Sequence, residues 1–562
     1  MMILIGWSIL VFSLALLAQS LFSLYLMMYT WWQPDRLQES RSPATFESPR
    51  LGFTVLLPAR HEKDVIYRTV RRVLDANYPE HLMQVLVICE ASDHETIVEA
   101  HRAFELIDSR RVAVLTFDDG PINKPHGLNI GLRAAANDIV TVFDAEDDLH
   151  PDIFNIINTI MTREDVRVVQ AGVQLMNYRD HWFSALNVME YFFWFRSRLH
   201  FHAQVGMIPL GGNTVFASRH LLEEVGGWDE RCLTEDADLG VRLSVLGEPI
   251  RVVYDPEHVT REETPDTLGS FIKQRTRWNQ GFLQVLLKRD WLRLPSFGQR
   301  ALALYTLSYP LVQGALLTIW PLSLAMLFVL KLPVPFALPA LSPLYAIGFQ
   351  FFLNFIGLWE FTRLYKLRFA AVTPLTLAIC FLPFQFVLGF GALRAVYREL
   401  RGHANWEKTE HIGAHRVPEA GTPLLATPGS FANQLLETVL DRFDPSRASV
   451  LVRNGRDDSF SILASRGLDG DVGDTPALRL GEGIAGWVAE RGTPLIIGAG
   501  QPHVFPQGHL CRPELHSSIV FPVRRDDRTV AVINVGSTTR QFTDEDVSWL
   551  ERYVDRMLLT EA

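Results

Sequence analysis

The chain has 562 residues, 48% of them hydrophobic, and its 53 basic and 63 acidic side chains give a net charge of −10. So apolar a chain is not disordered, and so acidic a chain lacks the basic surface of most nucleic-acid binders. We therefore expect about three to four domains' worth of folded protein and no nucleic-acid partner. The cysteines are too widely spaced for a CxxC site or a disulfide framework, which favours a reducing compartment. They are Cys89, Cys232, Cys380 and Cys511.

The first 34 residues contain no charged side chain. About 20 apolar residues suffice to cross a bilayer, and no basic n-region or small-residue cleavage site marks a signal peptide. We therefore expect residues 1–34 to be a retained transmembrane anchor. Arg36, Arg41 and Arg50 follow it, so the positive-inside rule places the N-terminus outside and residue 35 onward in the cytoplasm.

Apolar runs separated by helix-like stretches come next. Strands that alternate with helices predict a mainly parallel, doubly wound α/β sheet, whose ligand site lies at the carboxyl ends of the strands. Polar clusters follow three of the runs, and clustered carboxylates repel each other unless solvent or a cation neutralises them. The pattern alone leaves a solvated rim and a cation site both open. The runs are residues 53–57, 85–89, 112–117 and 138–143, and the clusters are 58–62, 90–93 and 144–148.

An ordered set of motifs extends from about Gly52 to Leu286. It comprises Glu90, Lys124–Asn129, Asp144–Glu146, Gly211–Asn213, Thr234–Asp236 and Gln274–Trp278. This set resembles the catalytic domain of membrane-embedded family-2 glycosyltransferases, the group that contains cellulose, chitin and hyaluronan synthases. The resemblance implies a GT-A-like fold over residues 50–295 and a nucleotide-sugar donor, with a UDP-sugar expected.

The resemblance also assigns the donor and metal residues. The departing nucleoside diphosphate develops negative charge, which a hard divalent cation held by carboxylates neutralises. Mg²⁺ or Mn²⁺ is therefore the expected cofactor, with Asp144 and Glu146 as ligands. Glu146 stands where Asp is usual, so indirect ligation stays open, while Asp147 and Asp148 are expected to cap a helix that starts at Pro151. The expected donor-binding residues are Pro58, Glu62, Glu90, Lys124, Asp144 and Arg277.

The acceptor hydroxyl must lose a proton as it attacks, which requires an ionised carboxylate. By resemblance this base is Asp236, with Glu235 as its catalytic neighbour, and a single base implies inversion. The alternative is that Thr234 caps a helix on which Asp236 is an ordinary N-terminal acid. Residues i, i+3 and i+4 of the Gln274–Trp278 motif share one helix face, which also suits an amphipathic interface helix. The expected acceptor-binding residues are Gly212, Asn213, Gln274 and Trp278.

Three later apolar stretches predict a helical transmembrane block over residues 301–396. They are about 301–330, 341–359 and 369–393. The basic region 394–415 is expected in the cytoplasm, so an even number of crossings must separate it from residue 35. Three candidates violate this parity, so one is interfacial or re-entrant, or a fourth is hidden. Residues 397–424 are expected to hold a segment, Trp406–His411, that resembles a gating loop, and a linker.

Residues 425–562 predict an α+β domain. Its order of helices and strands resembles a GAF domain, particularly at Gly481–Ala489 and Gln541–Asp546. The first segment also satisfies GxGxxG, but it lacks a βαβ setting and a following acid, so we do not expect dinucleotide binding. The resemblance implies an unknown small ligand or a dimer partner.

The sequence thus predicts an inverting, metal-dependent glycosyltransferase of the cell membrane with several crossings. It would transfer sugar onto a glycan acceptor, a growing β-linked (exo)polysaccharide, with its catalytic and GAF-like domains in the cytoplasm and the latter regulatory. The alternatives are non-processive transfer to a lipid or a short glycan, and a membrane sensor with a degenerate transferase domain.

Overall fold

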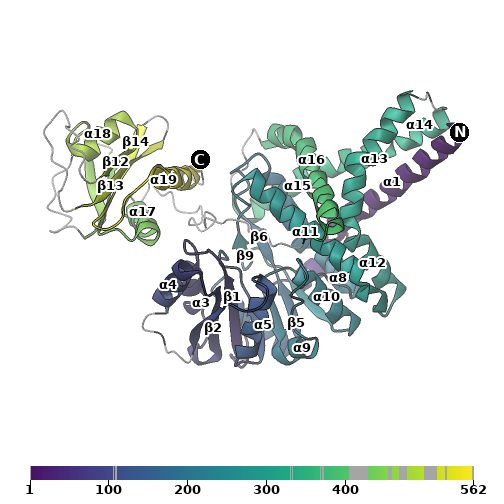
Figure 1. Cartoon of the computed structure of the whole chain (residues 1–562), viewed down its shortest axis with the longest axis horizontal. Coiled ribbons are helices and arrows are strands. Elements are labelled where there is room, and N and C mark those ends of the chain that lie inside the picture. Colours follow the sequence, from purple (N-terminus) through teal and green to yellow (C-terminus); the bar gives the residue numbers. More distant parts are fainter. Residues whose placement is uncertain are drawn as a thin grey trace. The chain divides into compact units, whose positions relative to one another are not determined.

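The computed structural model forms two compact units, residues 1–416 and 417–562, each with its own hydrophobic core (Figure 1). The gating-loop-like segment Trp406–His411 and Cys511 lie outside the residues that the structure describes. Those are residues 2–104, 107, 111–329, 331, 333–367, 369, 373–403, 428–453, 459–467, 478–498, 515–525 and 528–559.

A seven-stranded sheet forms the centre of the first unit, in the order β3–β2–β1–β4–β7–β5–β8. The first four strands of this order are parallel, and β7 runs antiparallel to both of its neighbours. All four predicted strands are present, as Phe53–Ala59 (β1), Met83–Glu90 (β2), Val112–Phe117 (β3) and Ile139–Val142 (β4). The others are Val168–Ala171 (β5), Val215–Ser218 (β7) and Ile250–Val253 (β8).

Helices cover both faces of this sheet because its strands carry apolar side chains on both. Phe53 and Val55 point to one face, and Leu56 points to the other. The prediction of a doubly wound α/β fold is confirmed. The helices of the first face are α3 (Ile66–Leu74), α4 (His94–Ala103) and α6 (Ile153–Glu164), and those of the second are α5 (Lys124–Ala134), α9 (Arg219–Glu224) and α10 (Glu235–Val245).

Several helices connect the sheet to the apolar block. Helix α7 (Ser184–Phe193), which is rich in aromatic residues, continues through a π-helical turn, Trp194–Arg198, into α8 (Leu199–Val205). The helix of the Gln274–Trp278 motif is α11 (Leu268–Lys288). Val173–Leu175 (β6), which precedes α7 in the chain, pairs with Thr260–Glu262 (β9), which precedes α11, to form a separate two-stranded sheet. Short 3₁₀ turns form at Glu80–Leu82 and Asp290–Arg293.

Four helical stretches in the described residues are long and apolar enough to cross a membrane. The predicted stretch 301–330 is divided at Ser308, and no fourth candidate occurs between residues 35 and 394 of the described chain. Figure 1 shows α1, α13 and α14 extending together away from the sheet. The helices of this region are α1 (Met2–Trp32), α2 (Pro34–Glu39), α12 (Phe297–Leu307), α13 (Tyr309–Val329), α14 (Val334–Ala340), α15 (Ser342–Leu364) and α16 (Thr373–Leu400).

Helix α11 packs along the second half of α16. The ring of Phe271 stacks on that of Phe384 with centroids 5.6 Å apart, and Gln280 Nε2 donates a hydrogen bond to Glu399 at 3.1 Å. This contact attaches the motif helix directly to an apolar helix of the block.

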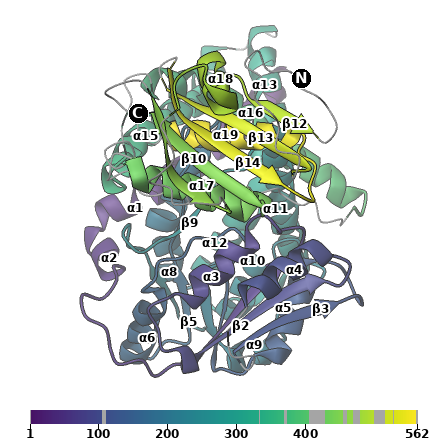
Figure 2. The same ribbon diagram turned by 90° about the vertical axis from the view of Figure 1, so that its left-hand side faces the viewer.

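The second unit is an α+β domain with a five-stranded antiparallel sheet in the order β11–β10–β14–β13–β12, whose strands lie side by side in Figure 2. Helices α17 and α19 cover one face, and α18 covers the other. The predicted α+β fold is confirmed. The elements are α17 (Pro428–Phe443), β10 (Arg447–Arg453), β11 (Phe460–Arg466), α18 (Gly483–Arg491), β12 (Leu495–Gly498), β13 (Ser517–Arg525), β14 (Arg528–Ser537) and α19 (Asp544–Leu559).

Because the second unit has its own core, we expect residues 425–562 to unfold cooperatively when expressed alone. Leu550 is fully buried between α19 and the sheet, and Leu550→Ala should lower the free energy of unfolding by about 3 kcal/mol. Urea denaturation followed by circular dichroism measures this change. Glu551→Ala, at the exposed neighbouring position, should change it by less than about 0.5 kcal/mol. Equal effects would show that α19 does not pack as described.

Candidate active site

Every residue that the sequence predicted for the donor, the metal, the acceptor and the base lines one cavity of about 460 Å³. The cavity lies at the carboxyl ends of β1, β2 and β4 and extends past α11 to the apolar helices. The structure therefore brings together side chains that are as much as 220 residues apart. The predicted residues in its wall are Pro58, Glu62, Glu90, Lys124, Asp144, Glu146, Gly212, Asn213, Glu235, Asp236, Gln274, Arg277 and Trp278.

The wall formed after β1 and β2 holds its acids in place. Arg60 Nε donates a hydrogen bond to Glu90 Oε2 at 3.1 Å, and the Ser92 hydroxyl donates to Glu90 Oε1 at 2.9 Å. The backbone N–H of Glu62 donates to Thr96 at 3.0 Å. Glu90 therefore presents a fixed, ion-paired carboxylate in place of the usual Asp.

Lys124 lies between the two groups of acids. It is the first residue of α5, which begins where the Asn123 side chain accepts a hydrogen bond from the N–H of His126 at 3.0 Å. Its ammonium group forms an ion pair with Asp144 and donates a hydrogen bond to the carbonyl of Gly212 at 3.0 Å. Burial lowers the pKa of Lys124, but the charge of Asp144 and its hydrogen bond to Lys124, together with other nearby acids, outweigh burial and raise the pKa above its ordinary value. Lys124 therefore stays charged.

In the turn after β4, the Asp147 carboxylate accepts hydrogen bonds that hold the turn together, a role that the sequence did not predict. The N–H of Asp144 donates to Asp147 Oδ2 at 2.8 Å, and Asn213 Nδ2 donates to both carboxylate oxygens at 2.9 and 2.8 Å. Burial, followed by the charge of Glu262, raises the pKa of Asp147 well above its ordinary value. The prediction that Asp147 and Asp148 cap the next helix is wrong, because Asp147 closes this turn, Asp148 pairs with Arg72 at 2.9 Å and α6 begins only at Ile153.

The carboxylates suit a cation that the substrate helps to bind. Within the described residues, no three His, Cys, Asp or Glu side chains are grouped to hold a metal ion. Mg²⁺ usually takes one or two carboxylates and completes its shell with substrate phosphates and water. Asp144, which here binds the cationic Lys124, and Glu146 in the same cavity match that kind of site.

Glu235 and Asp236 occupy the first turn of α10. Burial raises the pKa of Asp236 above its ordinary value, and burial together with the charge of Asp236 raises that of Glu235 to about 8. Glu235 therefore carries a proton at neutral pH. Thr234 occupies the N-cap position without a side-chain capping hydrogen bond, and Asp236 lies in the first turn of the helix, so it is an N-terminal acid as the alternative predicts.

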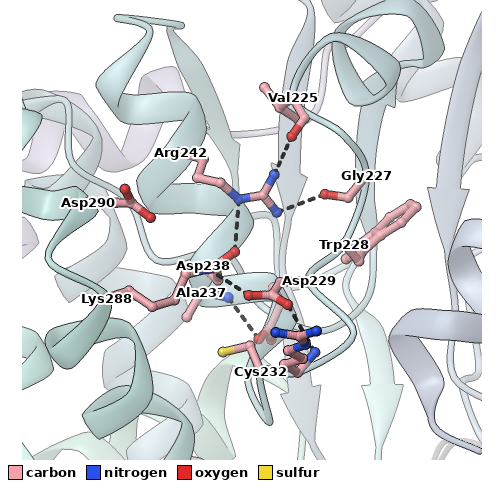
Figure 3. A network of polar contacts seen from close by, with 12 residues as sticks. Val225, Gly227, Trp228, Asp229, Cys232, Ala237, Asp238, Arg242, Lys288 and Asp290 are labelled. Carbon is pink, nitrogen blue, oxygen red and sulfur yellow. Dashed lines mark hydrogen bonds and ion pairs between the residues drawn. The ribbon is translucent and has the colours of Figure 1, made fainter. Parts of the chain in front are cut away.

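A buried ion network fixes the helix that carries this pair (Figure 3). Arg242 Nε donates to Asp238 at 2.8 Å, and its other nitrogens donate to the carbonyls of Val225 and Gly227, each at 2.7 Å. Lys288, at the end of α11, pairs with Asp238 and, at 2.8 Å, with Asp229. Asp238 is 1% exposed, so this network ties α10, α11 and the preceding loop together around a buried carboxylate.

Close backbone contacts fix the same helix. A side-chain carbon on Gly240 would lie 2.2 Å from the carbonyl oxygen of Ile208, and one on Gly281 would lie 2.6 Å from the nitrogen of Thr234. Only hydrogen fits at either position. The α10 helix is therefore in direct contact with α11 and with the segment before Gly211.

Sequence reasoning missed several cavity residues. Glu262 at the end of β9 contacts Asn213, and Tyr191 of α7 lies 6.1 Å from Trp278 between ring centroids. The paired acids Glu262 and Glu263, which follow an isolated polar strand, were the available signal. Amide side chains of the apolar helices also line the cavity. Polar residues within apolar helices commonly mark functional sites, so these residues could have been found from the sequence. They are Gln313, Gln350, Asn354 and Gln385.

Family comparisons agree with this architecture. Residues 49–281 match the family model "Glycosyltransferase like family 2", and residues 426–557 match that of the GAF domain. The chain carries a family-2 glycosyltransferase domain and a GAF domain. The catalytic resemblance and the identity of the tail are thereby confirmed.

Curated relatives match the transferase domain. A probable glycosyltransferase, YdaM, of Bacillus subtilis is 27% identical over 43% of this chain and 57% of its own length. A beta-monoglucosyldiacylglycerol synthase of Trichormus variabilis is 28% identical over 42% and 49%. A poly-beta-1,6-N-acetyl-D-glucosamine synthase of Staphylococcus epidermidis is 26% identical over 46% and 60%. The chain thus spans about half to three fifths of each relative.

Gly212 of the transferase domain has no room for a methyl group beside the carboxylate pair. A side-chain carbon there would lie 3.2 Å from Asp236 Oδ2. Gly212→Ala should therefore displace that carboxylate and lower the rate of sugar transfer about tenfold. Release of nucleoside diphosphate by purified membranes measures the rate. Gly269→Ala on α11, whose new carbon meets only Thr267 at 3.9 Å, should leave it unchanged, and an unaffected Gly212→Ala would contradict the described contact.

The pKa of Glu235 predicts a pH dependence of donor binding. Above about pH 8 Glu235 loses its proton and adds a further negative charge to the cavity. The KM for the nucleotide sugar should therefore rise above pH 8 in the parent and stay level in Glu235→Gln. Steady-state kinetics from pH 6 to about 9.5 test this. The same rise in both proteins would show that Glu235 is not the ionising group.

Proposed function

We propose that the protein is an inverting, metal-dependent glycosyltransferase that moves a sugar from a nucleotide-sugar donor, a UDP-sugar, onto a growing β-linked polysaccharide. The observation that carries the proposal is the arrangement of one cavity. Its wall has Asp144, paired with Lys124, on the donor side, and Asp236 at the start of α10 as the proposed single base. One base with one leaving-group site gives a single displacement.

In this reaction the acceptor hydroxyl oxygen bonds to the anomeric carbon as its proton passes to Asp236. The bond from that carbon to the diphosphate oxygen breaks at the same time, and its electron pair leaves with the nucleoside diphosphate. Attack opposite the leaving group inverts the anomeric centre. Lys124 and Arg277 line the donor side and stabilise the charge that develops on the phosphate oxygens.

Asp144 and Glu146 would hold Mg²⁺ or Mn²⁺ together with the donor phosphates. When bound, the ion would supply Lewis-acid stabilisation of the leaving diphosphate. Release of Asp144 to the ion would free Lys124 to contact the phosphates, because the two side chains are paired with each other in this structure.

The acceptor half of the cavity supports a glycan acceptor. Trp278 and Tyr191 offer aromatic faces, which suit the apolar faces of sugar rings. Beyond them, amides of three apolar helices line the cavity at Gln313, Asn354 and Gln385. Amides both donate to and accept from hydroxyl groups. This uncharged lining suits a neutral, hydroxyl-rich chain that enters the membrane block.

Transfer to a lipid is the second candidate. The same half of the cavity includes Leu26, Met27 and Leu388 from apolar helices, which suit an acyl chain. The name of the Trichormus relative supports diacylglycerol as acceptor, with its glycoside as the product. Digestion of the product by glycosidases and its partition into organic solvent would separate a polymer from a lipid glycoside.

We also propose a location and a role for the tail. The basic residues that follow α1 support a cell-membrane protein with both units in the cytoplasm. The GAF domain would bind a small ligand or a second copy and regulate the transferase.

The catalytic proposal is tested by substituting the base. Asp236→Asn keeps the side-chain shape but cannot accept the proton, so release of nucleoside diphosphate should fall about a thousandfold. Purified membranes are assayed with UDP-glucose and UDP-N-acetylglucosamine in the presence of Mg²⁺ or Mn²⁺. Asp290→Asn, outside the cavity in the 3₁₀ turn after α11, serves as the matched control. A parent that turns over no nucleotide sugar, or an Asp236→Asn variant as fast as the parent, would refute the proposal.

A further inference from the structure

Arg275 lies between the two helices that cover the acceptor half of the cavity. It is on α11, within the Gln274–Trp278 motif, and is 8% exposed. Its Nη2 forms an ion pair with Glu190 of α7 at 2.8 Å and a hydrogen bond with the side-chain oxygen of Asn187. Arg275 therefore joins α11 to α7 through two side chains of the same helix.

The same guanidinium group contacts the aromatic side chains around it. Its central carbon lies 4.6 Å from the centroid of the Trp278 ring and 4.9 Å from that of Phe271. Trp278 is also near Tyr191 on α7, with the ring centroids 6.1 Å apart. The Trp278 indole is thus flanked by the Arg275 guanidinium group, which α7 side chains hold in place, and by Tyr191 of α7.

The approach of α16 limits movement of Arg275. A side-chain carbon on Gly391 would lie 3.3 Å from the Cβ of Arg275. The backbone of α16 therefore restrains Arg275 at its Cβ. The ion pair with Glu190 holds its guanidinium nitrogen, and the contact with Trp278 holds the plane of the guanidinium group. A planar guanidinium group can satisfy the pairing and the stacking together, whereas an ammonium group cannot.

We propose that Arg275, held by Glu190 and Asn187, is a positioning residue that sets the plane of the Trp278 indole and thereby the affinity for the acceptor sugar. This proposal rests on the proposed function, in which Trp278 contacts the acceptor. The donor groups proposed above are Lys124, Asp144 and Arg277, and they include neither Arg275 nor Glu190, so the donor step should proceed without these two side chains.

The position of the indole can be observed without any substrate. The full chain is labelled with 5-fluorotryptophan in detergent micelles, and Trp278→Phe identifies the Trp278 resonance among those of the 13 tryptophans. In Arg275→Met that ¹⁹F resonance should shift and broaden, and in Arg275→Lys it should change less. Lys273→Met, which removes an exposed cation from the same helix, should leave it unchanged.

Kinetics separate positioning from a general loss of structure. Arg275→Met should raise the acceptor KM about tenfold, as expected for loss of a desolvated cation–π contact. Its rate of donor hydrolysis to water should stay within about twofold of the parent. Glu190→Gln added to Arg275→Met should cause little further loss, because both act through the same indole.

An unchanged Trp278 resonance in Arg275→Met would overturn the proposal, as would an equal fall in donor hydrolysis and sugar transfer. If Arg275→Met does not fold, the comparison is made with Arg275→Lys, for which full parental behaviour would overturn it. If the parent turns over no nucleotide sugar, the proposed function fails, whereas the ¹⁹F comparison still decides whether Arg275 positions the indole.

Discussion

The compensation of buried negative charge by Lys124 is the constraint on which the active site depends. Asp144 comes from the end of β4, and Glu235 and Asp236 come from the start of α10, so folding brings three carboxyl groups towards one cavity. Isolated buried carboxylates are costly, and a paired cation or a bound proton offsets the cost. Lys124 supplies the cation to Asp144, and the raised pKa of Glu235 supplies the proton. The cation and the proton together offset the cost of bringing these carboxyl groups into one cavity.

Most of the fold could be predicted from local sequence pattern. The strands β1 to β4 are apolar runs bounded by polar clusters, and such runs have a clear period and length. Strand β7 could not be placed, because its antiparallel pairing with β4 and β5 depends on residues some 45 to 75 positions earlier in the chain. The strand β12 has only four residues, too few for a pattern. The number of membrane crossings likewise depends on packing that hydropathy does not encode.

The site was predictable where motifs carry the chemistry and unpredictable where distant segments complete it. The motif residues converge on one cavity because most of them follow strands of one sheet or lie on α10 and α11. The partners that hold them come from elsewhere. Glu190 and Tyr191 reach Arg275 and Trp278 from another helix, and Glu262 reaches Asn213 from a separate small sheet. Asp147 was misassigned because its neighbours in space, rather than in sequence, decide its role.

The contacts at Gly240 and Gly281 change how related sequences should be interpreted. At each position the backbone of another segment is so close that only the hydrogen atom of glycine fits, and neither glycine lines the cavity. In an alignment of relatives with this geometry, both glycines would remain invariant and would look like catalytic positions. Their invariance would reflect the close packing of α10 against its neighbours beside Asp236. A comparison that ranks residues by conservation alone would therefore mistake a packing requirement for a chemical role.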